Sequence, residues 1–138
     1  MRFNILGGLV VVLALSLPAA AEDVLDAGYA AYRAGDYSAA LAAWQPLAEQ
    51  GHRKAQLYVG YMYRQGIGVS ADPRQAARWY RKAAEQGVPE AQYQYALMLE
   101  LGIGVEPDYW AAEGWYQQAT SHGYCPSQLS AGGALGDR

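Results

Sequence analysis

The chain repeats itself with a fixed stride of 36 residues. The tetrapeptide GIGV occurs at Gly66–Val69 and again at Gly102–Val105. The same shift aligns further identical pairs: Ala55 with Ala91, Gln56 with Gln92, Met62 with Met98, Asp72 with Asp108, Trp79-Tyr80 with Trp115-Tyr116, and Gly87 with Gly123. A unit of this length is one supersecondary element that cannot bury its apolar face alone. The stride therefore predicts hairpins that stack on one another.

Within one unit, the residue pattern predicts two helices joined by a glycine-rich turn. The first helix is expected at 53–65, because Gly66 can adopt the left-handed conformation that ends a helix. Asp72 followed by Pro73 is typical of a helix start, and Gly87 ends the second helix. Apolar residues three and four apart between these points indicate one buried side for each helix. We therefore expect an all-α protein.

The two full repeats are flanked by less regular units. A shorter hairpin around Gly35-Asp36 precedes them, and Ser127-Gln128-Leu129 begins a further copy that does not continue. The predicted organisation is a hairpin at 22–51, repeats at 52–87 and 88–123, and a partial repeat with a tail at 124–138. Gly114 lies inside a predicted helix of the second repeat, where glycine costs about 1 kcal/mol relative to alanine.

The first 21 residues have the features of a secretory signal peptide. Arg2 supplies a positive start, residues 5–17 are almost entirely apolar, and the Pro18–Ala21 segment offers a small-residue cleavage site. We predict cleavage after Ala21. The apolar run is shorter than the roughly 20 residues that cross a bilayer, so no stable membrane span is expected. The expected localisation is periplasmic or secreted.

The best-defined unit, residues 55–87, carries the pattern A-Q-x-x-x-G-x-M-Y-x-x-G-x-G-V-x-x-D-x-x-x-A-x-x-W-Y-x-K-A-A-E-Q-G. This pattern resembles a Sel1-like repeat, which is related to the tetratricopeptide repeat. The second repeat is similar, with Ala96, Leu99 and Thr120 as departures. The resemblance implies a right-handed α/α solenoid whose first helices line a concave groove that binds proteins or peptides.

Tetratricopeptide-like concave positions can be mapped onto the first helix of each hairpin. The implied partner-binding groove residues are Leu25, Tyr29, Tyr32 and Arg33 in the first hairpin, Lys54, Leu57, Tyr61 and Arg64 in the second, and Glu90, Tyr93, Leu97 and Glu100 in the third. Tyrosine and arginine are frequent hot spots because they give large contact areas at low entropic cost.

The sequence offers little support for catalysis or metal binding. His52 and His122 lack a second ligand at metal spacing, and Cys125 is the only cysteine. No nucleophile motif or phosphate-binding loop is found, so we expect no catalytic residues, no metal and no cofactor. A secreted, cysteine-rich branch of the family is associated with β-lactam binding or hydrolysis, but its cysteine pairs are missing here. A β-lactam or cell-wall hydrolase is the alternative function.

Charge alternates along the predicted stack. Residues 22–51 carry a net charge of −4, residues 52–86 carry +5, and residues 88–124 carry −5 without any lysine or arginine. Charged faces that are simply solvated explain the alternation. The alternative hypothesis is that the bands of opposite charge select a partner or a second copy of the chain. Nucleic acid is not expected, because acidic units flank the one basic band.

The tryptophans give two further expectations. Trp44, Trp79 and Trp115 have core spacing, whereas Trp110 lies at a first-turn position that should face outward. Trp110 is either a lid over the unfinished C-terminal end or a binding anchor, and we favour the lid. We expect an exported, non-enzymatic module that binds a protein or peptide of the cell envelope. Homodimerisation through the C-terminal face is a further reading.

Overall fold

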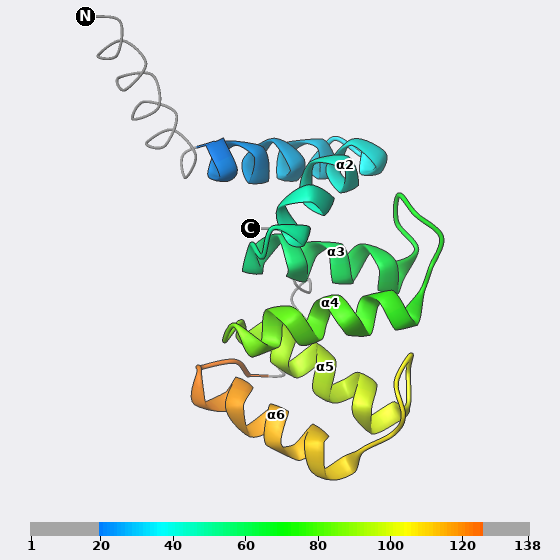
Figure 1. The fold of residues 1–138 in the computed structure, drawn as a ribbon, viewed down its shortest axis with the longest axis vertical. Helices are drawn as coiled ribbons and strands as arrows, with labels where there is room; N and C mark the ends of the chain where they lie inside the picture. The colour runs from blue at the N-terminus through cyan, green and yellow to red at the C-terminus, as the bar shows by residue number, and fades with distance from the viewer. Residues whose placement is uncertain (1–19, 126–138) are drawn as a thin grey trace, which may run out of the picture.

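The computed structural model describes residues 20–125, and within this range every regular element is a helix (Figure 1). A helix covers residues 20–33 of the described chain. It is followed by α2 (Tyr37–Glu49), α3 (Arg53–Gln65), α4 (Pro73–Glu85), α5 (Pro89–Leu101) and α6 (Tyr109–Ser121). Residues 1–19 of the predicted signal peptide and residues 126–138 of the partial repeat lie outside the described residues.

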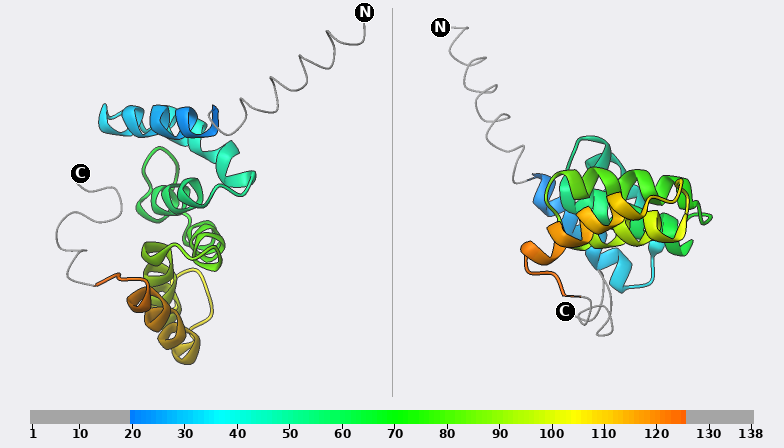
Figure 2. Two further views of the ribbon diagram at one scale, coloured as in Figure 1. Left: turned by 90° about the vertical axis from the view of Figure 1, so that its left-hand side faces the viewer. Right: turned by 90° about the horizontal axis from the view of Figure 1, so that it is seen from below.

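The helices stack in chain order along the long axis of the molecule (Figures 1 and 2). The hairpin partners α3 and α4 pack together, as do α5 and α6, while α2 packs on α3 and α4 on α5. The long turns that join α3 to α4 and α5 to α6 project on the same side in Figure 1. This arrangement is an all-α repeat solenoid, which confirms the predicted fold class.

Three aspartates at the same stride start the second helix of each hairpin. The side chains of Asp36, Asp72 and Asp108 accept hydrogen bonds from backbone N–H groups in the first turns of α2, α4 and α6. These bonds satisfy donors that have no partner inside the helix. The first hairpin therefore keeps the repeat register at this point, although its turn is shorter.

The repeated GIGV turn has a structural role between neighbouring units. Gly66 and Gly102 end α3 and α5 with left-handed φ angles of 68° and 67°. Gly104 is also left-handed, and a Cβ atom added to it would lie 2.2 Å from the backbone oxygen of Pro73. A Cβ atom added to Gly68 would lie 2.7 Å from the backbone oxygen of Tyr37, the first residue of α2. Each turn thus rests on the start of the second helix in the preceding hairpin.

The apolar interior is continuous from one hairpin to the next. One buried cluster contains Trp44, Met62 and Trp79, and the other contains Leu57 and Tyr80. Helices α3 and α4 contribute side chains to both clusters, and the half-buried Tyr58 and Tyr63 pack against both. No hairpin therefore has a separate core.

Buried glutamines add a polar link at each repeat boundary. Gln56 Nε2 donates to the Ala48 carbonyl at 3.1 Å, and its equivalent Gln92 Nε2 donates to the Ala84 carbonyl at 3.2 Å. Gln56 Oε1 also accepts from Gln86 Nε2 at 2.7 Å. Each of these carbonyl groups, near the ends of α2 and α4, also accepts a backbone hydrogen bond, from Gly51 and Gly87 respectively, so the glutamine supplies its second donor. The glutamine of the Ala-Gln pair therefore ties each unit to its predecessor.

The tryptophans follow the core prediction only in part. Trp44 and Trp79 are buried, whereas Trp115 is half-buried with its ring against Tyr95 at 5.8 Å between centroids. No further described helix packs beyond α6, so Trp115 lacks the cover that Trp79 receives from its neighbours. Trp110 is 89% exposed, so the favoured lid reading is wrong for the described part of the chain. Its ring is too open to solvent to cover a core.

Candidate partner-binding surface

Half-buried tyrosines lie along the first helix of each hairpin. We call this set the tyrosine surface, and it consists of Tyr29, Tyr32, Tyr58, Tyr61 and Tyr93. The helix at 20–33, α3 and α5 each contribute at least one member. Because these side chains are half-buried, each packs against the protein on one side and meets solvent on another. The surface therefore extends over all three hairpins.

The first part of this surface is an aromatic group centred on Trp44. The Trp44 ring lies 4.7 Å from the Tyr58 ring and 6.0 Å from the Tyr32 ring, and Tyr29 lies 6.5 Å from Tyr58. The buried Trp44 Nε1 donates to the Leu25 carbonyl at 3.0 Å. A buried indole thus fixes the half-exposed tyrosines in place, which limits their loss of freedom on binding.

Tyr61 and Arg64 connect this aromatic group to the next hairpin. Burial raises the pKa of Tyr32 to about 12, and the neighbouring Tyr61 contributes through its charge and a side-chain hydrogen bond. Arg64 Nη1 donates a hydrogen bond to Gln94 Oε1 on α5. Burial also raises the pKa of Tyr80, and the nearby Arg64 guanidinium opposes this shift. The Tyr80 hydroxyl has no hydrogen-bond partner among the described residues.

The last part of the surface is organised around Tyr93. Its ring lies 5.2 Å from that of Tyr116 and 5.4 Å from that of Tyr124. Tyr116 donates its hydroxyl proton to Glu100 Oε2 at 2.6 Å, and burial together with this bond raises the pKa of Tyr116. Tyr58 was not predicted from the sequence as a member of this surface, nor were Tyr116 and the buried Tyr124 predicted to support Tyr93.

Most of the predicted groove residues are accessible, but two are not. Leu57 is 4% exposed and packs in the same cluster as Tyr80 and Ala91, so it cannot contact a partner. Leu25 is also 4% exposed, within the other cluster. The prediction that Leu25 and Leu57 line the groove was wrong. Burying a leucine side chain is worth about 2 kcal/mol, and both side chains can reach the interior. The remaining predicted residues are half-buried or exposed, namely Tyr29, Tyr32, Arg33, Lys54, Tyr61, Arg64, Glu90, Tyr93, Leu97 and Glu100.

Leu97 is the apolar member that best fits a contact role. It occupies the position equivalent to Tyr61, is half-buried, and among the described residues belongs to neither core cluster. Glu100 and Arg64 occupy equivalent positions with opposite charge. Neighbouring hairpins therefore present the same geometry with different side chains, which allows one scaffold to distinguish ligands.

Within residues 20–125, the side chains that could bind a metal do not gather. No group of three or more His, Cys, Asp or Glu residues is found there, and Cys125 is an exposed free thiol. None of the helices described is long and apolar enough to cross a bilayer.

Comparison with known proteins identifies the family. The Sel1 repeat family matches at residues 53–88 and 89–124, which together make up more than half of the chain. The chain belongs to the Sel1 repeat family. Sel1 repeats are generally non-catalytic scaffolds for protein interaction. The matched segments begin one residue later than the repeats expected from the sequence.

Two solved Sel1-type structures resemble this chain. A Sel1 repeat protein from Oxalobacter formigenes is 39% identical, with a TM-score of 0.64, over 70% of this chain and 28% of its own. A protective antigen of uropathogenic Escherichia coli strains with an SLR fold is 35% identical, with a TM-score of 0.72, over 81% of this chain and 25% of its own. This chain thus spans only about a quarter of either relative. No curated protein matches the chain at a comparable level.

Proposed function

We propose that this Sel1 repeat protein is an exported, non-enzymatic scaffold that binds a protein or peptide of the bacterial cell envelope through the tyrosine surface. The observation that supports this most strongly is the continuity of the surface. Aromatic packing links Tyr29 of the helix at 20–33 to Tyr58 of α3, and Arg64 of α3 is hydrogen-bonded to Gln94 of α5, the neighbour of Tyr93 in the sequence. An extended ligand could contact all three hairpins at once.

The residue types favour a protein ligand over a small molecule. Tyrosine provides a rigid apolar ring with a polar hydroxyl, which suits irregular protein surfaces. Lys54 and Glu100 are exposed on the first helices, one on α3 and the other on α5, so the flanking charges differ in sign along the stack. Complementary charges of this kind set specificity and the rate of encounter. Leu97 adds an apolar contact on α5, three residues before Glu100.

Export is the less direct part of the proposal. It rests on the positive start, apolar run and small-residue site within residues 1–21. An envelope partner follows from that localisation. A processed N-terminus after Ala21 in protein recovered from the periplasm or the medium supports it, and a full-length N-terminus in a cytoplasmic fraction contradicts it.

Site-specific photo-crosslinking in cells tests the binding surface. A photoreactive residue at Tyr61 should give a discrete crosslinked product, whereas one at Tyr109 should not, because Tyr109 is 70% exposed at the start of α6 and outside the tyrosine surface. Leu97→Glu should abolish the Tyr61 product without unfolding the protein. Tyr109→Glu, which makes the same kind of change elsewhere, should leave it intact.

Two outcomes would contradict the proposal. One is the same crosslinked product from positions 61 and 109, which would indicate contact without a defined surface. The other is full retention of the Tyr61 product in the Leu97→Glu variant, provided that circular dichroism shows an unchanged helical content.

A further inference from the structure

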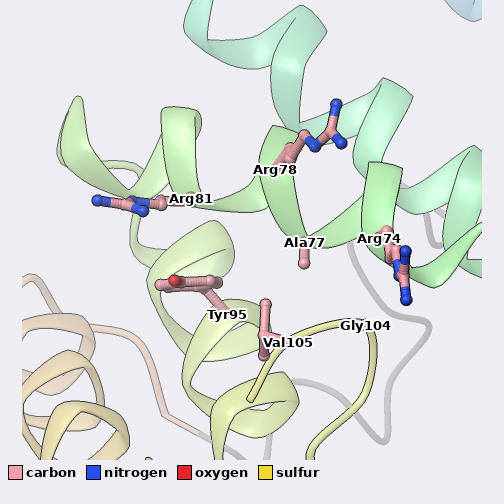
Figure 3. A pocket seen from close by; sticks show the side chains of 7 residues that line it. All are labelled: Arg74, Ala77, Arg78, Arg81, Tyr95, Gly104 and Val105. Carbon is pink, nitrogen blue, oxygen red and sulfur yellow. The ribbon is translucent and has the colours of Figure 1, made fainter.

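A second surface lies on α4, shares no residue with the tyrosine surface and was not predicted from the sequence. It is a pocket of about 210 Å³ between α4, α5 and the second GIGV turn, and its lining residues are Arg74, Ala77, Arg78, Arg81, Tyr95, Gly104 and Val105 (Figure 3). Three arginines of α4 thus border the pocket, and the Arg78 guanidinium points away from the floor formed with the following repeat (Figure 3).

The arginines are available to a ligand. All three are exposed, and neither Arg74 nor Arg78 has a carboxylate within salt-bridge distance in the described part of the chain. Arg81 Nε donates to Glu85 Oε1 at 2.8 Å, but both side chains of this pair are more than half exposed. An exposed pair of this kind contributes little, so a competing carboxylate can replace Glu85.

The layout of the pocket restricts the ligand. Figure 3 shows Arg74 and Arg81 on either side of a floor formed by Ala77, Tyr95 and Val105. The volume is below the roughly 300–1,000 Å³ of typical small-molecule sites, so it fits one side chain better than a whole cofactor. Guanidinium groups bind carboxylates through paired hydrogen bonds. The pocket therefore suits an apolar side chain with a carboxylate on each side.

The spacing of the arginines further restricts which ligands fit the pocket. Arg74 and Arg81 are seven residues apart, which is about 10.5 Å along a helix axis. In an extended peptide, residues i, i+2 and i+4 share one face, and the outer two are about 13 Å apart. Arginine side chains are long enough to absorb the difference. We propose that this pocket binds an extended acidic peptide segment of the form acid-x-apolar-x-acid, with its apolar side chain on Tyr95 and Val105.

Fluorescence anisotropy with a short labelled peptide tests this inference. The probe is Gly-Glu-Ser-Leu-Ser-Glu-Gly, and its control is the scrambled Gly-Glu-Glu-Leu-Ser-Ser-Gly, which has the same charge and composition. The ordered peptide should bind at least about tenfold more tightly than the scrambled one if spacing matters. Raising the salt to about 1 M should weaken the binding, because screening then acts within about 3 Å.

A matched pair of variants separates the pocket from net charge. Arg74→Gln with Arg81→Gln should weaken binding of the ordered peptide at least about tenfold. Arg53→Gln with Lys82→Gln removes the same charge from exposed positions that do not line the pocket, and should leave binding nearly unchanged. All four side chains are exposed, and the contacts that are lost, Arg81 with Glu85 and Lys82 over the Trp79 ring, each contribute little to stability at an exposed site, so both variants should unfold within a few degrees of the wild type.

Four results would overturn the inference. The first two are no binding of the ordered peptide up to about 1 mM and equal binding of the scrambled peptide. The third is an equal loss of peptide binding in the two double variants. The fourth is a molecular mass in solution that rises with protein concentration in the wild type but not in the Arg74→Gln, Arg81→Gln variant. The last result would mean that the acidic repeat of a second copy, not a peptide, occupies the pocket. A failure of the photo-crosslinking experiment at Tyr61 would not affect this test, because the two surfaces share no residue.

Discussion

Replacing Gly104 with alanine should lower the free energy of unfolding more than the same change at Gly87. Both glycines have left-handed φ angles, +70° and +83°, so each alanine variant incurs the cost of placing an L-residue there, about 1–2 kcal/mol. Only Gly104 also meets neighbouring backbone, since its added Cβ would lie 2.2 Å from Pro73 O, whereas nothing lies within 4 Å at Gly87.

The second cost at Gly104 can be estimated. Backbone atoms of Pro73 and Arg74 cannot move aside as a flexible side chain could, so the GIGV turn must lift off α4. Inserting a methyl group into a packed site typically costs about 1–3 kcal/mol. The expected total for Gly104→Ala is about 2–5 kcal/mol, compared with about 1–2 kcal/mol for Gly87→Ala. A domain of this size has only about 5–15 kcal/mol of stability.

Urea unfolding monitored by circular dichroism measures both variants. Gly104→Ala should show a lower midpoint than Gly87→Ala, with similar slopes because the native fold is kept. Equal midpoints for the two variants would refute the explanation of the repeated GIGV turn as a contact between neighbouring hairpins.

Three further predictions follow from individual contacts. Gly114→Ala should stabilise the protein by about 1 kcal/mol, because Gly114 lies inside α6, has no positive φ and would have no atom within 4 Å of its Cβ; a lower melting temperature would contradict this. Gln92→Leu should cost about 1 kcal/mol in the free energy of unfolding, because the Ala84 carbonyl loses one of its two donors. Gln117→Leu at an exposed site should stay within about 0.5 kcal/mol of wild type, and equal costs for the two variants would contradict a role for the buried bond. The urea midpoint should be constant up to about pH 10 and then fall toward pH 12. Tyrosines of the unfolded chain release protons near pH 10, whereas burial in the folded protein raises the pKa of Tyr32 to about 12 and also raises the pKa of Tyr80. Tyr80→Phe should reduce this fall in the midpoint, and a pH profile identical to that of the wild type would count against the assignment.

The helix boundaries could be predicted from the sequence because local chemistry determines them. Gly66 and Gly102 end α3 and α5, and Asp72 and Asp108 begin α4 and α6 whatever packs around them. These signals act over a few residues, so one repeat is enough to recognise them. The stride then extends the assignment to the second repeat.

The surfaces were harder to predict because they depend on contacts between hairpins. Leu57 and Tyr93 are equivalent in sequence, yet Leu57 is in the core and Tyr93 is half-buried. The length of the side chain and the packing of the neighbouring hairpin determine whether the residue is buried. The sequence repeat carries no information on that packing. The signal that could have identified Tyr124 is its place immediately after Gly123 at the end of α6, which returns the chain toward α5.

The arginine pocket on α4 illustrates the same limit. Its arginines come from one repeat, and its floor includes Tyr95, Gly104 and Val105 from the next. The excess of positive charge in residues 52–86 was visible in the sequence. That Arg74 and Arg81 flank an apolar floor became apparent only when the second GIGV turn was placed on the start of α4.

Native-state hydrogen exchange of the Leu47→Ala variant tests most directly whether the hairpins share one interior. Leu47 belongs to the first core cluster and is 6% exposed, so its truncation should cost about 2–5 kcal/mol. If the stack unfolds as one cooperative body, the amides of α5 should lose as much protection as those of α2. Unchanged protection in α5 and α6, alongside a large loss in α2, would contradict a continuous interior.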